Sequence, residues 1–334
     1  MLEWAVISYR YDLKDPSGSR VQVGIAEVRD NKKMEGFWWI RNLSILGLGS
    51  KALDQFSVYP QKIKDKIERE GLKETCAKAG LTSLYISDSI PIEYEGPVAV
   101  FGDAHGNHTR LKLLLKKLNA QHEGIPIFTT GDLIDRGPNS KAVIDTCIKN
   151  GIRGVLGNHD QWLHQYISGF GFDSFALSPA MDGQATIRSY GVEDCRQEAV
   201  EEDLYRHIPE AHHAWVYNML PYQKIIVGGH TYWLIHAGLG IPDIQRYWSE
   251  FKGTEDDFMA FLCRRTQGIF QWGHIEHLPD GVFQFPSGAT IVMGHRVKRD
   301  PIVAPHVICL DTGCGLPWGR LTAVILPSGE TLSE

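Results

Sequence analysis

Three short clusters of metal-binding residue types, each opened by glycine, constrain the fold of this 334-residue chain more than any other feature. They are residues 102–106 (GDAHG), 131–138 (GDLIDRGP) and 157–160 (GNHD). Each cluster follows a short apolar run of strand length and precedes a helix-like stretch. Because the carboxyl ends of parallel strands meet at one edge of a sheet, such β-α-β units would bring the three clusters together. The sequence therefore predicts an α/β fold with a polar site at that edge.

The composition limits the class of protein and its partners. The apolar fraction of 43% and the charged fraction of 22% are typical of a globular chain with enough length for a substantial core. The formal net charge is −6, which gives no reason to expect a nucleic-acid-binding surface. A locally basic phosphate pocket is still allowed, because net charge does not describe a single cleft.

The cysteines and the amino terminus bear on the compartment. The six cysteines form no CxxC pair, which favours buried free thiols in a reducing environment. Residues 1–4 (MLEW) show neither a basic nor an apolar signal region, and no apolar run approaches the length of a membrane span. We therefore expect a cytoplasmic protein without a membrane partner. The sequence gives no indication of its oligomeric state.

We expect two domains. Residues 1–95 precede every chemical motif and form an α+β extension of unknown role: 4–11 and 21–28 alternate loosely, as in a hairpin, and 63–79 has helical spacing. We favour packing of this extension on the catalytic domain over a regulatory or partner-binding role. Residues 96–334 would form the catalytic domain.

The expected elements of the catalytic domain can be placed from their patterns. We expect helices at residues 108–118 and 140–149, after the first two clusters, and a mostly helical stretch at 160–222, after the third. A hairpin that turns at Gly228 and Gly229 is expected at 222–236, and two further buried strands at 290–293 and 307–310.

The three clusters also predict the chemistry of the site. Carboxylate, imidazole and amide oxygens on three adjacent turns suit one or two borderline divalent cations, such as manganese, iron or zinc.

The order of the clusters resembles that of the phosphoprotein phosphatase family of binuclear metallophosphoesterases, whose pattern runs GDxHG, GDxxDRG, GNH(E/D). Two later elements of that pattern are present, His236 in LIHAG and His295 in VMGHR. The resemblance covers about residues 97–326, and five elements in order are far more specific than any one of them. It implies a metallophosphoesterase-type βαβ sandwich, with central mixed sheets flanked by helices, and a helical cap formed by residues 160–222.

The resemblance implies a pair of divalent metal ions as cofactor. We expect Mn²⁺, with iron or zinc as alternatives. Two such ions about 3.5–4 Å apart lower the pKa of a bridging water and clamp the phosphoryl oxygens. The implied ligands are Asp103 and His105 for the first metal, Asp132 as the bridge, and Asn158, His236 and His295 for the second metal.

The expected catalytic residues lie in the second and third clusters, at residues 131–138 and 157–160. His159 adjoins a metal ligand and is the natural general acid for the leaving oxygen. Asp135 resembles the family residue that pairs with this imidazole and raises its pKa, although alone it would be read as a turn carboxylate. The Arg136 guanidinium suits bidentate contact with two phosphoryl oxygens.

Two further residues are carried over by the resemblance. The family has a second phosphate-binding arginine between the late histidines, and Arg265 is the nearest match. Cys263 stands where the family has tryptophan, so Arg264, or a surface role for both arginines, is an alternative. Asp311 begins the closing DTG segment, and we expect it to support the site without binding metal.

These residues predict a phosphoesterase that uses a metal-bridging hydroxide. We favour a serine/threonine protein phosphatase, because the Asp135–Arg136 pair is complete, with a phosphoprotein or a small phosphorylated molecule as substrate. A symmetrical bis(5′-nucleosyl)-tetraphosphate (diadenosine tetraphosphate) hydrolase is the alternative, because Asp160 stands where the phosphatases usually have glutamate and residues 310–323 resemble that hydrolase. A non-catalytic binding module on the same fold is a second alternative, although every expected ligand is present.

Overall fold

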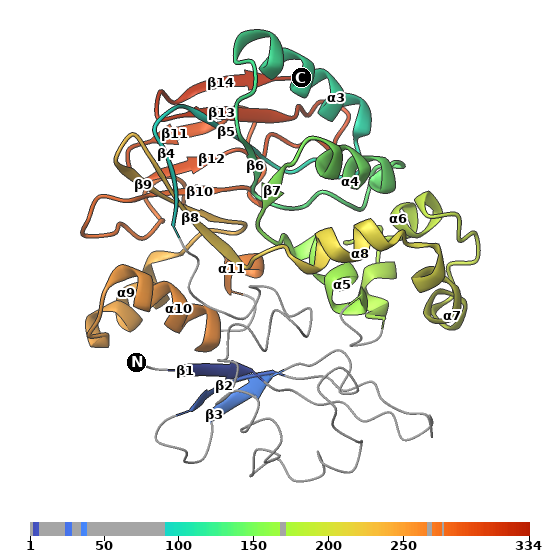
Figure 1. Ribbon diagram of the computed structural model, residues 1–334, viewed down its shortest axis with the longest axis horizontal. Coiled ribbons are helices and arrows are strands. Elements are labelled where there is room, and N and C mark those ends of the chain that lie inside the picture. Colours follow the sequence, from blue (N-terminus) through green and yellow to red (C-terminus); the bar gives the residue numbers. More distant parts are fainter. Residues whose placement is uncertain are drawn as a thin grey trace. The chain divides into compact units, whose positions relative to one another are not determined.

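The computed structural model describes residues 91–167, 172–265, 269–275 and 277–334, together with three strands before residue 40 (Figure 1). The chain divides into two compact units, residues 1–88 with 165–171 and residues 89–164 with 172–334. Among the described helices, none has the length and apolar character needed to cross a membrane.

The first unit contains a small antiparallel sheet of order β1-β2-β3. Its strands are β1 (Glu3–Val6), β2 (Gly24–Val28) and β3 (Glu35–Trp38). β1 and β2 pair antiparallel with Glu3 opposite Val28, as the hairpin expected from residues 4–11 and 21–28 requires. The helix expected at 63–79 lies outside the described residues.

A five-stranded sheet in the second unit carries the three motif clusters. Its order is β14-β13-β5-β6-β7, and β5, β6 and β7 are parallel. β13 pairs antiparallel with both β5 and β14. The strands are β5 (Val98–Phe101), β6 (Ile127–Thr129), β7 (Arg153–Gly154), β13 (Thr322–Leu326) and β14 (Glu330–Ser333). The predicted β-α-β succession is therefore confirmed.

Helices α3 (His108–Gln121) and α4 (Ser140–Lys149) connect the parallel strands. α3 begins after Asn107, whose side chain accepts the backbone N–H of Arg110 at 3.2 Å and so caps the helix. Asn139 occupies the same position before α4 but makes no such side-chain bond. Both helices bury one apolar stripe, which packs them on the sheet; in α3 the stripe is Leu111, Leu114 and Leu118.

A six-stranded mixed sheet completes the second unit, in the order β11-β12-β10-β9-β8-β4. β8 and β9 form the predicted hairpin, and Gly228 (φ 56°) and Gly229 (φ 79°) supply the positive φ angles that its two-residue turn requires. β9, β10 and β12 run parallel. The strands are β4 (Ile92–Tyr94), β8 (Tyr222–Val227), β9 (His230–Ile235), β10 (Thr290–Met293), β11 (Ile302–Ala304) and β12 (Val307–Cys309).

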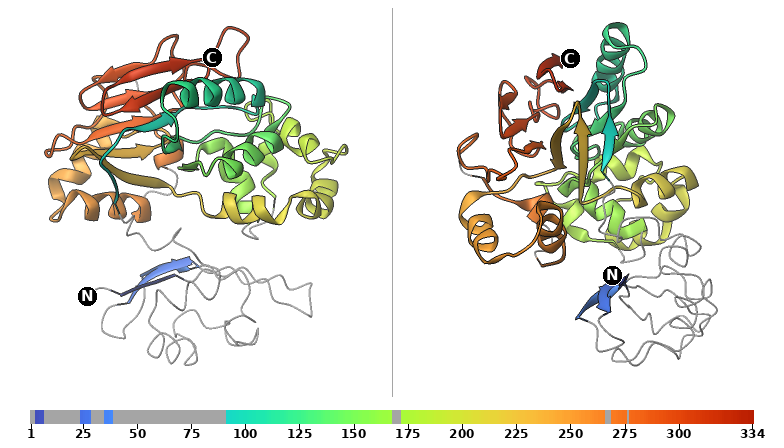
Figure 2. Two further views of the ribbon diagram at one scale, coloured as in Figure 1. Left: turned by 45° about the horizontal axis from the view of Figure 1, so that its top comes forward. Right: turned by 60° about the vertical axis from the view of Figure 1, so that its left-hand side comes forward.

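Alternate residues of β9 enter two different cores, because successive side chains of a strand point to opposite faces. Leu234 packs between the two sheets with Val100 and Phe128. Trp233 and Ile235 face the other way, toward helices α9 (Ile241–Glu250), α10 (Glu255–Arg265) and α11 (Ile269–Trp272). In the right-hand view of Figure 2 the strands stand between α3 and α4 on one side and α9 and α10 on the other. The expected sandwich of mixed sheets flanked by helices is confirmed.

The segment predicted to be mostly helical follows the third cluster. It contains α5 (Asn158–Ile167), the short 3₁₀ helix η3 (Ser174–Leu177), α6 (Gln184–Ser189), α7 (Gln197–His207) and α8 (Glu210–Tyr217) (Figure 1). α5 is the element that matters for the site, because its first turn carries Asn158 and His159.

We predict that the core between the two sheets dominates the stability of this unit. Leu234→Ala should lower the free energy of unfolding by about 2–5 kcal/mol, because the cavity lies between two packed sheets and cannot collapse. Leu113→Ala is the matched control: this leucine is 46% exposed on α3, and its loss should change stability by about 0.5 kcal/mol or less. Urea unfolding monitored by circular dichroism measures both. Equal effects of the two substitutions would contradict this account of the core.

Candidate metal centre

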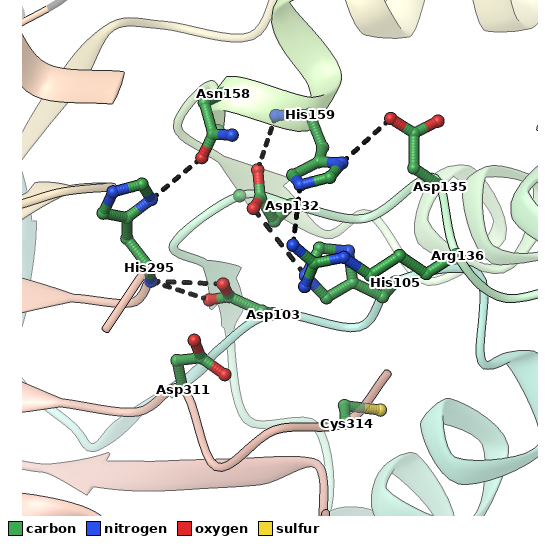
Figure 3. Close-up of polar contacts among 12 residues, drawn as sticks. Asp103, His105, Asp132, Asp135, Arg136, Asn158, His159, His295, Asp311 and Cys314 are labelled. Carbon is green, nitrogen blue, oxygen red and sulfur yellow. Dashed lines mark hydrogen bonds and ion pairs between the residues drawn. The ribbon is translucent and has the colours of Figure 1, made fainter. Parts of the chain in front are cut away.

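The expected metal ligands all lie just beyond the carboxyl ends of strands. Asp103 and His105 follow β5, Asp132 follows β6, Asn158 follows β7, His236 follows β9 and His295 follows β10. The ends of the two sheets meet there: the backbone N–H of His295 donates to Asp103 Oδ2 at 3.1 Å, and His236 Nδ1 lies 2.9 Å from the Thr130 carbonyl oxygen. The structure therefore brings all six predicted ligands to one place: Figure 3 labels five of them, and His236 lies beside Asn158 and Asp132.

The imidazole of His236 shows why this place fits a cation. Its Nδ1 carries the proton, because the Thr130 carbonyl oxygen beside it can only accept. The lone pair of the neutral ring is then at Nε2, which lies 2.9 Å from Asn158 Oδ1 and 3.3 Å from Asp132 Oδ2. His295 Nδ1 also lies 2.9 Å from Asn158 Oδ1. When the His236 ring is neutral, its Nε2 lone pair and the lone pairs of these two oxygens repel one another unless positive charge stands among them.

The pKa values of the buried groups also indicate that this place stabilises positive charge. Burial lowers the pKa of His236, but the Asp132 carboxylate outweighs it and the pKa rises to about 10. Burial raises the pKa of Asp132, yet the neighbouring imidazoles hold it well below its ordinary value. Burial lowers the pKa of His105 to about 3 and that of His295 to about 4. Near neutral pH a proton on His236 supplies this positive charge, and a bound cation would take the place of that proton. An ionised carboxylate among imidazoles is the donor set of a borderline divalent metal.

The first-metal side of the site is faced by Arg136. His105 Nδ1 donates to the Ile134 carbonyl at 3.1 Å, so its Nε2 is free to accept. Arg136 Nη1 lies 2.8 Å from that nitrogen, and Nη2 lies 3.1 Å from His159 Nε2. The guanidinium thus places positive charge between the two imidazoles. Donation to His159 Nε2 requires that this ring be neutral, so protonation of His159 would break this bond and leave Nη2 free, while Nη1 stays at His105.

Asp135 orients His159. Its Oδ2 lies 2.9 Å from His159 Nδ1, and the indole N–H of Trp162 donates to the same oxygen at 3.1 Å. The Thr186 hydroxyl donates to Oδ1 at 2.7 Å. Burial raises the pKa of Asp135, and the bonds from His159, Thr186 and Trp162 oppose that rise. A fully buried carboxylate with these partners is not a solvent-exposed turn residue; it fixes the imidazole in place.

The pKa of His159 reflects this pairing. Burial lowers it, but the carboxylates of Asp132 and Asp135 outweigh burial and raise the pKa above its usual value. The imidazole is therefore able to carry a proton near neutral pH, as a general acid requires.

Asp160 joins the second cluster to the third, a role that sequence reasoning missed. Its carboxylate accepts the backbone N–H groups of Asp132 (2.7 Å), Leu133 (2.9 Å) and Gly157 (3.1 Å). Hydrogen bonds to a carboxylate are stronger than neutral ones. Asp160 therefore fixes the loop that carries Asp132, the expected bridging ligand.

The backbone at the site is strained. His105, Asp132, Asp135, Arg136 and His295 have φ angles between 42° and 71°, in the left-handed region that residues with a side chain rarely adopt. Each such residue costs about 1–3 kcal/mol and persists only where its surroundings hold it. Five of them at one site indicate that the packing holds these side chains in a functional arrangement.

Two glycines explain why the clusters carry glycine beside the ligands. A Cβ atom at Gly157 would fall on Asp132 Oδ1, and one at Gly294 would fall on Asp103 Oδ1. Any side chain at either position would displace a carboxylate that faces the centre.

The closing loop after β12 also reaches the site. Asp311 Oδ1 accepts the backbone N–H of Gly313 at 2.9 Å, and burial, followed by the charge of Asp132, raises the pKa of Asp311 to about 6. A Cβ atom at Gly315 would lie 3.3 Å from both Arg136 Cδ and His105 Cβ, so this loop packs against the first-metal side.

Arg265 is the last residue of α10. Its side chain and that of Arg264 lie outside the described part of the structure, so the second phosphate-binding arginine stays a prediction.

Comparison with known proteins identifies the class of enzyme. Residues 96–299 match the family model described as calcineurin-like phosphoesterase. The asymmetrical bis(5′-nucleosyl)-tetraphosphatase PrpE of Bacillus subtilis (strain 168) is 26% identical in an alignment of 257 residues, which covers 70% of this chain and 92% of that protein. A symmetrical bis(5′-nucleosyl)-tetraphosphatase of Janthinobacterium sp. (strain Marseille) is 28% identical, over 69% of this chain and 93% of that protein.

Among solved structures, one described as a putative diadenosine tetraphosphatase covers 73% of this chain and 96% of its own, with 22% identity and a TM-score of 0.48. The match to the family model spans more than half of the chain, so this chain belongs to the calcineurin-like phosphoesterase family. It is a hydrolase that acts on phosphoric ester or acid anhydride bonds. Members of the family bind a pair of divalent metal ions, and the converging ligands described above fit such a pair.

We predict that Asp132→Asn abolishes hydrolysis and lowers the amount of bound metal, because the neutral amide no longer offsets the repulsion between two cations. The fold should survive, since the sheets carry the core. Plasma emission spectroscopy after equilibration with Mn²⁺, together with the melting temperature, measures both effects. Asp300→Asn removes an exposed carboxylate paired with Arg320 and is the control. Undiminished turnover by the Asp132 variant after exhaustive chelation would contradict the two-metal assignment.

Proposed function

We propose that this hydrolase cleaves bis(5′-nucleosyl) tetraphosphates, with a nucleotide as leaving group. The observation that carries this proposal is the similarity to both the asymmetrical and the symmetrical tetraphosphatases, which extends over more than nine-tenths of each relative's length. The part of the substrate outside the transferred phosphoryl group would be bound by the segments between the third cluster and His295.

The residues of the site have distinct tasks in this reaction. When bound, the two cations supply an activated water and neutralise the phosphoryl oxygens. His159 donates a proton to the oxygen that leaves, and Asp135 holds the ring with its other nitrogen turned inward. The Nη2 end of Arg136 is freed when His159 is protonated. The Nη1 end, which lies at His105 Nε2, would be freed if that nitrogen bound a metal, and the guanidinium would then suit two phosphoryl oxygens.

A serine/threonine protein phosphatase is the second candidate. The observation that favours it is the complete Asp135–His159 pair, buried and joined by a 2.9 Å hydrogen bond. A serine alkoxide is a poor leaving group and depends on a positioned acid, whereas the phosphate of a nucleotide leaves more readily. A buried His159 that is directly bonded to Asp135 would suit the phosphoserine ester, whose leaving group depends more on a positioned acid.

Steady-state kinetics with Mn²⁺ as the metal decides between the two substrates. We expect kcat/KM on diadenosine tetraphosphate to exceed that on a phosphoserine peptide by more than about tenfold, which is about 1.4 kcal/mol in transition-state binding. A phosphopeptide preference of the same size would overturn the proposal in favour of the protein phosphatase.

We predict that the cost of losing the acid depends on the leaving group. His159→Asn should lower turnover by about 10²–10⁴ for esters of poorly acidic alcohols, and much less for nitrophenyl phosphate, whose leaving group departs without a proton. Metal content should be unchanged. An equal loss on both substrates would show that His159 holds structure or metal and does not act as the acid.

The charge of Asp135 should set the pH range of activity. Its carboxylate raises the pKa of His159, and turnover that needs the protonated ring falls as the pH rises through that pKa. Asp135→Asn removes the charge, so the pKa falls and the alkaline limb of the kcat profile should move to lower pH, by about one unit or more. The profile for nitrophenyl phosphate is the internal control and should shift less. An alkaline limb that stays in place would exclude Asp135 as the partner that tunes His159.

A further inference from the structure

Two exposed aromatic rings from separate segments of the chain meet beside α5. Phe175 of η3 is 47% exposed, and Trp272 at the end of α11 is 44% exposed. Their ring centroids lie 6.0 Å apart, with the planes inclined by 54°. Single exposed apolar side chains are common, but a pair assembled from segments 97 positions apart in the sequence leaves a contiguous aromatic surface open to solvent. We refer to these two residues as the aromatic pair.

Trp272 is tied to the metal centre by two connections. Its indole N–H donates to Gln161 Oε1 at 2.7 Å. Gln161 lies on the first turn of α5, three residues after Asn158, and residues at that spacing share a helix face with their Cβ atoms about 5–6 Å apart. The helix that carries Trp272 is held as well, because Ala237, which follows His236, donates its backbone N–H to the carbonyl of Phe270 at 2.7 Å.

Phe175 is tied to the catalytic acid. The segment that carries it begins at Phe172, whose ring packs edge-on against Trp162 with centroids 5.6 Å apart. Trp162 in turn donates to Asp135, the carboxylate that orients His159. The side chain of Asp173 accepts the backbone N–H of Phe175 at 2.9 Å and fixes the turn on which the ring stands. Both rings are therefore positioned by chains of contacts that end at site residues.

The position of the aromatic pair limits what it could bind. The indole is linked through the Gln161 side chain to α5, whose first turn carries Asn158 and His159. In a nucleotide the base is joined to the phosphoryl group through a sugar, so a surface that binds the base is expected beside the ligands and not among them. The rings offer apolar faces, and nucleobases stack on aromatic side chains whatever their sequence identity.

We propose that the aromatic pair is a subsite that stacks a nucleobase of the substrate, with Trp272 as the main surface and Phe175 as its support. This inference rests on the proposed function, in which the substrate is a nucleotide. It assigns substrate specificity to the two cap segments around residues 172–177 and 269–272, which no sequence motif marks.

The test compares two ligands that differ only in the base. Adenosine 5′-(α,β-methylene)diphosphate and its ribose analogue without adenine are titrated calorimetrically into the Mn²⁺-loaded protein. We expect the wild type to bind the adenine-bearing ligand about 5- to 100-fold more tightly, as stacking on an aromatic side chain provides. Trp272→Ala should bring the two affinities within about twofold, Phe175→Ala should reduce the preference less, and Gln161→Ala should reduce it by releasing the indole.

Two controls keep the result specific. The affinity for the ligand without the base should be unchanged in every variant, which shows that the site is still folded. Tyr205→Ala removes an exposed aromatic ring on α7 that packs against His213, and it should keep the preference. Equal affinity of the wild type for both ligands, or a preference that survives Trp272→Ala, would overturn the subsite.

This test is separable from the proposed function. Hydrolysis of diadenosine tetraphosphate is measured independently on the wild type. A base preference that depends on Trp272, in an enzyme that does not cleave the tetraphosphate, would support the subsite and contradict the proposed function. Cleavage of the tetraphosphate without any base preference would support the proposed function and contradict the subsite.

Discussion

The structure depends on a buried convergence of oxygen and nitrogen lone pairs where the carboxyl edges of two sheets meet. His236 Nε2 faces Asn158 Oδ1 and Asp132 Oδ2 without a proton to share in its neutral form. Neither sheet could hold this arrangement alone, because Asp132 comes from one and His236 from the other. Divalent cations would offset the repulsion among these lone pairs. The surrounding contacts hold the groups together: three backbone N–H groups donate to the Asp160 carboxylate, and glycine stands at positions 157 and 294, where a Cβ atom would strike a carboxylate.

Much of this could be predicted from the sequence because the ligands are local to strand ends. A short apolar run followed by a glycine-opened cluster predicts a strand and the position of its ligand, and parallel strands align their ends. The β-α-β succession of β5, β6 and β7 and the meeting of the three clusters followed from that rule. The hairpin of β8 and β9 was indicated by the turn at Gly228 and Gly229, and the set of six ligands was implied by the family resemblance. Asp135 needed the family resemblance as well, since alone it would have been taken for a turn residue.

The remaining features depend on contacts between distant segments, which no local pattern records. Thr186 reaches Asp135 from α6, and the aromatic pair joins η3 to α11. The left-handed backbone at Asp132 and His295 is imposed by packing and is not a preference of those residues. Asp160 was read from the sequence as a mark of the substrate class, whereas its carboxylate anchors the loop of the bridging residue. Trp162, one helical turn after His159, is a partner of Asp135 that this spacing could have indicated, but the sequence analysis did not identify it.

The most direct test of the central claim is the anomalous scattering of crystals soaked in Mn²⁺. The account predicts two peaks about 3.5–4 Å apart, one on each side of the Asp132 carboxylate, with the second within bonding distance of His236, His295 and Asn158. A single peak, or two peaks that do not share Asp132, would contradict it.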